Sequence, residues 1–214
     1  GFPASPGPMR PTRLDLRQEQ QHQRNPRRQR GLTAIELLVT LVVLAILIGI
    51  AAPSMSRFIG QWRVSNAVNA LTGSLRIART EAIARSRPVV VCRVASSTST
   101  TCLSAMGSNG FGSGWIVFVN NDRDANNDFA AATDELLLRQ DTPPGITNIS
   151  LTNAGRFVFL PNGLLNDTSN GINVDASGFS SASATPWARK GLCVTKPGRV
   201  RSVADASSCA DIEK

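Results

Sequence analysis

An uninterrupted apolar stretch runs from Leu32 to Ala52 and contains a single charged residue, Glu36. A helix of these 21 residues is about 31 Å long at ~1.5 Å per residue, which matches the hydrocarbon core of a bilayer. The sequence before the stretch is strongly basic, whereas Arg57 is the first cation after it. The positive-inside rule therefore predicts one transmembrane segment over 32–56, with the N-terminus in the cytoplasm and the C-terminal body outside.

A second apolar pattern follows, in which residues recur at steps of three and four. This spacing places them on one face of a helix, which Pro88 is expected to end. We predict an amphipathic helix over 57–87 that continues the transmembrane segment and packs on a β-sheet. The predicted face consists of Val64, Val68, Leu71, Leu75, Ala78 and Ala82.

From residue 88 to 214 the pattern changes to short β-branched runs separated by Gly, Asn, Ser and Pro, which indicates strands and turns. The natural architecture is one α+β domain, with a long helix packed against an antiparallel sheet. The predicted strands are 89–94, 114–120, 135–140, 148–151, 156–160, 172–174, 191–195 and 199–203.

The composition and the distribution of charge indicate a folded protein with a basic N-terminal leader. Hydrophobic residues make up 42% of the chain and charged residues 18%, which excludes a disordered protein. The formal net charge is +8, and residues 1–31 carry +5 of it, because seven arginines face only Asp15 and Glu19. Residues 1–8 are rich in Pro and Gly, and we expect translation to begin at Met9.

The chain has few residues suited to catalysis. His22 is the only histidine, it lies in the basic leader, and there is no tyrosine. Without the leader no imidazole remains for acid–base or nucleophilic catalysis or for binding a metal. We therefore expect a protein that is not an enzyme and has no cofactor, metal or small-molecule substrate.

Glu36 is the anomaly of the apolar stretch. A carboxylate at the centre of a bilayer costs about 2.5 kcal/mol or more, so Glu36 is either functional or close to the cytoplasmic interface. The residue alone leaves both interpretations open. A secretory signal peptide would have an apolar core of about 7–15 residues, so the longer stretch favours a retained helix.

The segment 30–39, RGLTAIELLV, resembles the cleavage and methylation segment of type IV prepilins, which pilins share with type II secretion pseudopilins. Its signature is a basic leader that ends in Gly, followed by an apolar helix with Glu as its fifth residue. Gly31 and Glu36 fit this signature, whereas Leu32 replaces the usual Phe and Ala34 a common Leu. Pro53 matches the proline that many pilins carry in the first helix.

The resemblance implies a processing event and a mode of assembly. A prepilin peptidase would cut between Gly31 and Leu32, remove the leader 1–31 and methylate the new amine. The helix would stay anchored in the bacterial inner membrane, with residues 57–214 in the periplasm. In a filament, Glu36 would face the cationic N-terminus of a neighbouring subunit and act as a register device.

The middle of the chain resembles the general secretion pathway H / FimT family of minor pilins. The resemblance is carried by residues 115–128, WIVFVNNDRDANND, and 134–137, DELL, and the later segments 191–194 and 198–201 resemble that family's closing strands. It implies a pilin-like fold and other pilin or pseudopilin subunits as partners. The function implied is that of a subunit of a type II secretion pseudopilus; the alternatives are a DNA-binding type IV minor pilin and an uncleaved single-pass membrane protein.

Oxygen-bearing side chains at Asp122, Asp124, Asn126 and Asp128 also match the start of an EF-hand calcium loop. The sixth position is Asn127 instead of Gly, and the twelfth is Thr133, which cannot supply a bidentate carboxylate. A polar hairpin tip is therefore the favoured interpretation.

Four cysteines permit three pairings, and none of them has the Cys-x-x-Cys spacing typical of zinc sites. Oxidation is expected outside the inner membrane. We predict the disulfides Cys92–Cys102 and Cys193–Cys209, which close local loops, with four buried free thiols as the alternative.

Two basic segments could bind anions. Residues 57–93 carry +6, which indicates either a solvated helix face or contact with anionic lipid headgroups. Near the C-terminus, a basic stripe could bind DNA phosphates without reading sequence. Its Gly198–Arg201 tetrad resembles the Gly-Arg-x-Arg motif of FimT-like competence pilins. A Gly-Arg turn followed by a strand is, however, common across this family, including pseudopilins with no DNA role. The stripe consists of Arg189, Lys190, Lys196, Arg199 and Arg201.

Overall fold

The computed structural model describes residues 31–103, 105, 107–151, 155–166, 170–178, 186–207 and 209. The predicted leader up to residue 30, with the predicted start at Met9, lies outside the described residues. The chain divides into two units, residues 1–47 and residues 48–214.

Helix α2, Ala34–Arg85, is the one α-helix of the described residues and contains most of both predicted helical segments. It is long and apolar enough to cross a membrane by length and composition, and the most apolar window is wholly exposed within the chain. The predicted segment 32–56 falls almost entirely within it, and Pro53 lies inside the helix without ending it.

The helix ends two residues earlier than the predicted boundary at residue 87. Ser86 adopts φ 53°, a left-handed conformation, and the Arg87 amide donates to the Ala82 carbonyl at 3.3 Å. Pro88 disfavours helical geometry at the residue before it, so the chain must leave the helix before Arg87.

Eight strands form two antiparallel four-stranded sheets. One sheet has the order β3-β2-β1-β5 and the other β4-β6-β7-β8. All eight predicted strands are present, seven of them with shifted ends and 135–140 with the predicted ends, whereas their division into two sheets was not predicted. The strands are β1 Val89–Arg93, β2 Trp115–Val119, β3 Glu135–Gln140, β4 Ile146–Leu151, β5 Arg156–Phe159, β6 Asn170–Ala176, β7 Arg189–Val194 and β8 Val200–Val203.

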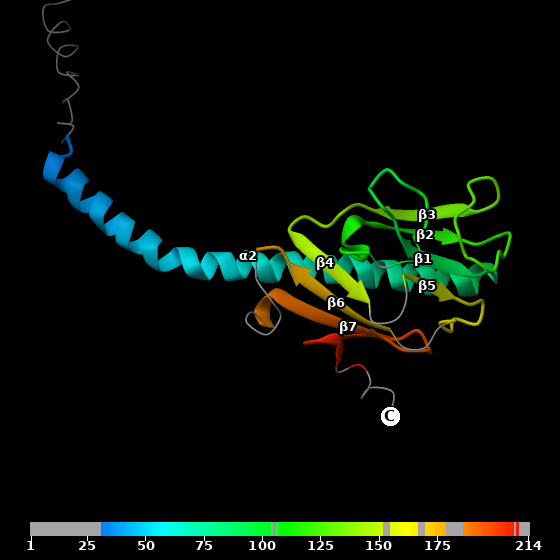
Figure 1. Ribbon diagram of the computed structural model, residues 1–214. Helices are drawn as coiled ribbons and strands as arrows, with labels where there is room; N and C mark the ends of the chain where they lie inside the picture. Colours follow the sequence, from blue (N-terminus) through cyan, green and yellow to red (C-terminus); the bar gives the residue numbers. More distant parts are fainter. Residues whose placement is uncertain are drawn as a thin grey trace, which may run out of the picture. The chain divides into compact units, whose positions relative to one another are not determined.

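The core joins the C-terminal half of α2 to both sheets (Figure 1). All six residues of the predicted apolar face are buried, and their neighbours include Val117 of β2 and Leu192 of β7. The indole N–H of Trp115 donates a buried hydrogen bond to the Ser74 hydroxyl of α2 at 2.9 Å. The short 3-10 helices η2, Phe111–Ser113, and η3, Pro186–Ala188, complete the described elements.

Strands β1 and β2 are buried on both faces, which explains why their sequences are apolar throughout apart from Arg93 at the end of β1. One face meets α2, and the other forms a second cluster with Cys102 and Phe129. Phe129 packs edge-on against Phe118, with ring centroids 5.3 Å apart. The loops after β1 and β2 therefore act as covers of the first sheet.

The segment 160–166 connects the two sheets. The Asn166 amide donates to the Val158 carbonyl of β5 at 2.8 Å, and the Leu165 amide donates to the Lys196 carbonyl after β7 at 2.8 Å. Arg79 of α2 donates to the Gly163 carbonyl at 3.2 Å and to the Gly198 carbonyl at 3.4 Å. One arginine of the helix thus holds a turn from each sheet.

Candidate functional site

The two predicted processing residues are exposed to solvent. Gly31 and Leu32 precede α2 and are exposed, and a Cβ at Gly31 would meet nothing within 4 Å. Neither residue therefore packs against the part of the chain that the structure describes.

Glu36 has a local structural role that the sequence analysis missed. Its amide donates to the Thr33 hydroxyl at 3.3 Å, so Thr33 caps the helix that begins at Ala34. Thr33 and Glu36 have the spacing of a capping box, and that spacing could have predicted this bond. A carboxylate in the first turn also interacts favourably with the helix dipole. The Glu36 side chain itself is exposed.

The five cations of the predicted basic stripe do not lie on one face. Strand alternation places Lys190 with the core residue Leu192, and Arg189 with Cys193 on the opposite face. Arg201 of β8 pairs with Cys193 and shares that outer face. Lys196 and Arg199 lie in the turn between β7 and β8. The five predicted DNA-binding residues are therefore divided between the two faces of the hairpin and its turn.

Arg189 is engaged within the chain and is not free to bind an anion. It forms a bidentate pair with Asp175, at 2.5 and 3.0 Å, and a further pair with Asp205 at 2.9 Å. Hydrogen bonding to Asp175, and then to Asp205, raises the pKa of Arg189. Bonds from Ser207, and then from Arg189, lower the pKa of Asp205 to about 2.

Lys190 lines a groove of about 550 Å³ between α2 and the β7–β8 hairpin. The groove also includes Gln61 and Val64 of the helix and Trp187 of η3. Lys190 is thus half-buried and separated from the exposed cations of the turn.

Lys196, Arg199 and Arg201 remain as an exposed group at the β7–β8 turn, which we name the turn cations. None of them pairs with a described acidic residue. Gly198 shapes this turn: it has φ +73°, and a Cβ there would lie 2.9 Å from the Gly163 carbonyl oxygen. The glycine of the tetrad is therefore required by the fold.

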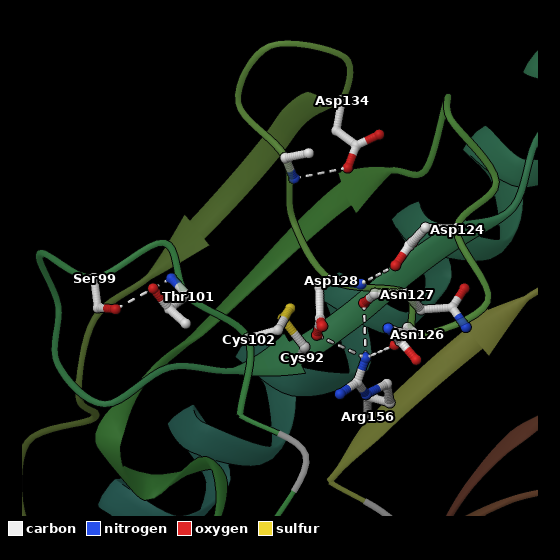
Figure 2. The surroundings of a disulfide bond; sticks show 11 residues. Cys92, Ser99, Thr101, Cys102, Asp124, Asn126, Asn127, Asp128, Asp134 and Arg156 are labelled. Atoms are coloured by element: carbon white, nitrogen blue, oxygen red, sulfur yellow. Dashed lines mark hydrogen bonds and ion pairs between the residues drawn. A yellow bond between two sulfur atoms is a disulfide. The ribbon is translucent and has the colours of Figure 1, made fainter.

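Both disulfides join the cysteines that the sequence favoured. Cys92 bonds to Cys102, with Cα atoms 5.6 Å apart, and Cys193 bonds to Cys209, with Cα atoms 5.4 Å apart. Figure 2 shows the first bond beside Arg156, which donates to the carbonyl oxygens of Asn126 and Asn127 and pairs with Asp128 at 3.1 Å. This arginine of β5 fixes the loop that covers the first sheet.

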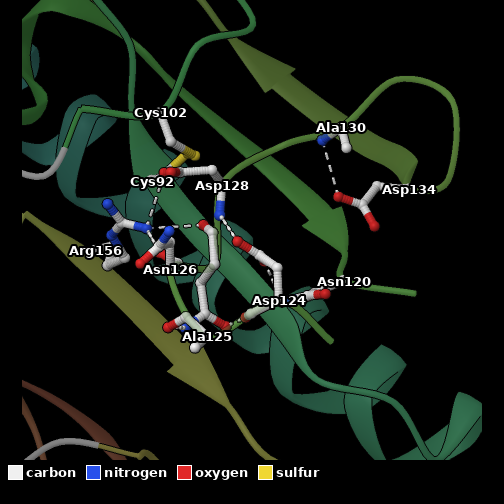
Figure 3. Close-up of polar contacts among 11 residues, drawn as sticks. Cys92, Cys102, Asn120, Asp124, Ala125, Asn126, Asp128, Ala130, Asp134 and Arg156 are labelled. Carbon is white, nitrogen blue, oxygen red and sulfur yellow. Dashed lines mark hydrogen bonds and ion pairs between the residues drawn. A yellow bond between two sulfur atoms is a disulfide. The ribbon is translucent and has the colours of Figure 1, made fainter. Parts of the chain in front are cut away.

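The polar loop 120–134 bonds mainly to itself (Figure 3). The buried Asn120 amide nitrogen donates to the Asp124 and Asn127 side-chain oxygens, each at 3.1 Å. The Asp124 carboxylate accepts the Asp128 amide at 3.3 Å, and Asp134 accepts the Ala130 amide at 2.9 Å. The loop is thus a polar hairpin tip whose side chains bond to its own backbone, which agrees with the interpretation favoured over a calcium loop.

Two known families match the chain. The family described as Type II transport protein GspH matches residues 67–191, and the prokaryotic N-terminal methylation motif matches residues 26–52. No curated protein matches the chain.

Two similar solved structures are minor filament subunits. The Pseudomonas aeruginosa type IV minor pilin FimU is 16% identical with a TM-score of 0.45, over 67% of this chain and 90% of that chain. The minor pseudopilin EpsH from the type 2 secretion system of Vibrio cholerae is 10% identical with a TM-score of 0.42, over 66% of this chain and 96% of that chain.

The GspH match covers more than half of the chain and includes most of the buried half of α2, the six strands β1 to β6 and the start of β7. The methylation motif covers the exposed apolar half of the same helix. The motif implies processing by a prepilin peptidase and assembly with other pilins. The chain therefore belongs to the GspH family of minor pilins and pseudopilins.

Proposed function

We propose that the chain is a minor subunit of a type II secretion pseudopilus or a type IV pilus, which co-assembles with other subunits and supports protein secretion. The observation that carries this proposal is an exposed apolar helix, attached to a GspH body, with Glu36 as the fifth residue after Gly31. The family consists of structural subunits, in keeping with the expectation that the chain is not an enzyme.

Processing occurs between Gly31 and Leu32. The prepilin peptidase removes residues 1–31 on the cytoplasmic side and methylates the amine of Leu32. The exposure of both residues and the match of the methylation motif to residues 26–52 support this step.

The mature chain is a single-pass protein of the bacterial inner membrane. Residues 32–56 span the bilayer with the N-terminus in the cytoplasm, and residues 57–214 fold in the periplasm. The basic residues before the span and the two disulfides support this orientation, because the periplasm is oxidising.

Assembly places Glu36 opposite the Leu32 amine of a neighbouring subunit. A buried carboxylate is tolerated when it is paired, and an unpaired one penalises a wrong register. Pro53 lies within α2 in the part of the helix that enters the filament core.

Cleavage is tested by mass spectrometry of the chain made with and without a prepilin peptidase. The proposal expects a mature N-terminus of N-methylated Leu32, and the Gly31→Val variant should stay uncleaved. Gly49→Val is the matched control, because both glycines have open space around them. If wild type keeps its leader in the presence of the peptidase, the chain is an uncleaved single-pass membrane protein and the proposed processing is wrong.

Assembly is tested with Glu36→Gln, which keeps a capping-box side chain but removes the charge. We expect normal cleavage and a loss of roughly tenfold or more in the sheared filament fraction, because the Leu32 amine then lacks its partner. Incorporation equal to wild type would overturn the proposed role of Glu36.

A second candidate function is DNA binding during natural transformation. The turn cations favour it, since all three are exposed and unpaired among the described residues. Arg189 and Lys190 do not support it, because one is ion-paired and the other half-buried.

DNA binding is tested by a gel shift of the solubilised mature chain at several salt concentrations. The candidate expects salt-sensitive retardation that Arg199→Ala/Arg201→Ala removes. The control Arg76→Ala/Arg123→Ala removes the same charge from two other exposed sites and should retain binding. Wild type without retardation would exclude this function.

A further inference from the structure

Helix α2 carries a second apolar stripe that the body leaves uncovered. Met55, Phe58, Ile59 and Trp62 are 56%, 63%, 38% and 59% exposed. Their spacing of three, four and seven residues places them on one face of the helix. We name these four residues the outer stripe.

The outer stripe faces away from the sheets. Val64, the first residue of the buried face, follows Trp62 by two residues, which is a rotation of about 200° in an α-helix. The buried face therefore lies on the opposite side of α2. No described residue of the body packs over the outer stripe.

The outer stripe is short: Met55 lies in the last turn of the predicted membrane span, and the other three residues follow the span directly. The following positions on the same face are Asn66, Asn69 and Gly73, so the surface becomes polar after Trp62. Arg57 lies within the same two turns, and the sequence holds no acidic residue between Glu36 and Glu81. The segment thus combines aromatic residues with uncompensated positive charge.

We propose that the outer stripe anchors the unassembled subunit in the interfacial layer of the bilayer, with Arg57 near lipid phosphates. Tryptophan is the residue type most suited to this layer, because its ring is apolar and its N–H is polar. Anionic lipid also attracts arginines close to a span. This inference rests on the proposed function, which makes residues 32–56 a membrane span.

The length of the helix agrees with this position. A hydrocarbon core of about 20 residues that begins just after Glu36 ends near Ser56. Phe58 and Trp62 then lie about 3 Å and 9 Å beyond it along the helix, and an ordinary tilt reduces the second value to about 8 Å. The headgroup layer is about 5–8 Å thick, so both rings fall within or at its edge. This placement puts Glu36 at the cytoplasmic interface before assembly.

The test uses the full mature chain in vesicles of phosphatidylethanolamine and phosphatidylglycerol. Bromine atoms at a shallow acyl position of the lipid quench nearby tryptophans. We expect quenching in wild type, loss of most of it in Trp62→Phe, and its retention in Trp187→Phe. Trp187 is the matched control, because it lies in the body at η3.

Three outcomes would overturn the anchor. The first is quenching that is unchanged in Trp62→Phe. The second is Trp62 quenched by aqueous iodide and not by brominated lipid. The third is Trp62 shielded from both quenchers until the protein is diluted into excess lipid, which would mean that a second copy covers the stripe.

Alkaline carbonate extraction of the same vesicles separates this inference from the proposed function. A chain that stays in the membrane while Trp62 escapes lipid quenching overturns the anchor alone. A chain that carbonate removes overturns the membrane span itself, and with it both proposals.

Discussion

The Arg79 guanidinium of α2 donates to the carbonyl oxygen of Gly198 at 3.4 Å, in the turn that begins the Gly-Arg-x-Arg tetrad. The same side chain donates to Gly163, so the turns that follow β5 and β7 share one partner on the helix. The tetrad therefore combines a structural glycine with two exposed arginines. A test of DNA binding should change the arginines and leave the glycine.

Gly198→Ala should destabilise the body by roughly 2–4 kcal/mol. The alanine would adopt a left-handed φ, which costs about 1–2 kcal/mol, and its Cβ would crowd the Gly163 carbonyl 2.9 Å away. Denaturant unfolding measures the change.

Gly178→Ala is the matched control for this substitution. Gly178 has φ +85°, and a Cβ at this position would meet nothing within 4 Å, so only the backbone cost of about 1–2 kcal/mol should appear. Equal losses in both variants would show that the contact with Gly163 has no energetic role.

Ser74→Ala should cost about 1–3 kcal/mol, because it leaves the buried Trp115 N–H without an acceptor. The Ser74 hydroxyl also donates to the Ala70 carbonyl, and the Thr80 hydroxyl donates in the same way to the Arg76 carbonyl. Thr80→Ala is therefore the matched control, and it should lose little stability because Thr80 is exposed. Thermal unfolding compares the two variants. A Ser74 variant as stable as the Thr80 variant would contradict the role of the bond.

Removal of either disulfide should lower stability by about 2–4 kcal/mol, since each closes a loop of 10 or 16 residues. The pairs Cys92→Ser/Cys102→Ser and Cys193→Ser/Cys209→Ser test this separately. Mass spectrometry of wild-type peptides without reduction checks the pairing first. A peptide that joins Cys92 to Cys193 or to Cys209 would contradict the structure.

Asp205→Asn should destabilise the body at neutral pH and lose this effect in acid. The pKa of Asp205 is lowered to about 2 from an ordinary 3.8, so its stabilising contribution is complete above pH 3.8 and disappears as the pH falls toward 2. The side chain is 37% exposed, which limits the effect to about 1 kcal/mol.

Unfolding curves of wild type and Asp205→Asn across this pH range measure the effect. Asp141→Asn removes the same charge from an exposed carboxylate and serves as the control. A difference between wild type and the Asp205 variant that persists unchanged at pH 2 would refute the explanation.

The helix and the strands could be predicted because their signals are local. The apolar periodicity of 64–82 and the β-branched runs after residue 88 both reflect which side chains a single element buries. The arrangement in two sheets could not be predicted from the sequence, because β5 pairs with β1 rather than with its chain neighbour β4. Such pairing depends on contacts between distant residues.

The surface formed by the basic residues between 189 and 201 could not be predicted from the sequence for the same reason. Five cations between residues 189 and 201 suggest one surface, but strand alternation divides them between two faces and a turn. The partners of Arg189 come from β6 and from the segment after β8. Charge counted along the chain cannot reveal which cations the fold neutralises.

The contacts between α2 and the sheets have a mechanical consequence. The buried face extends from Val64 to Ala82, about 27 Å of helix, and further bonds join the helix to β2, to β3 and to both turns that Arg79 holds. A pulling force along the helix axis would load all of these contacts in shear at once. The part of α2 from Val64 onward and the two sheets would therefore respond to such a force as one mechanical unit.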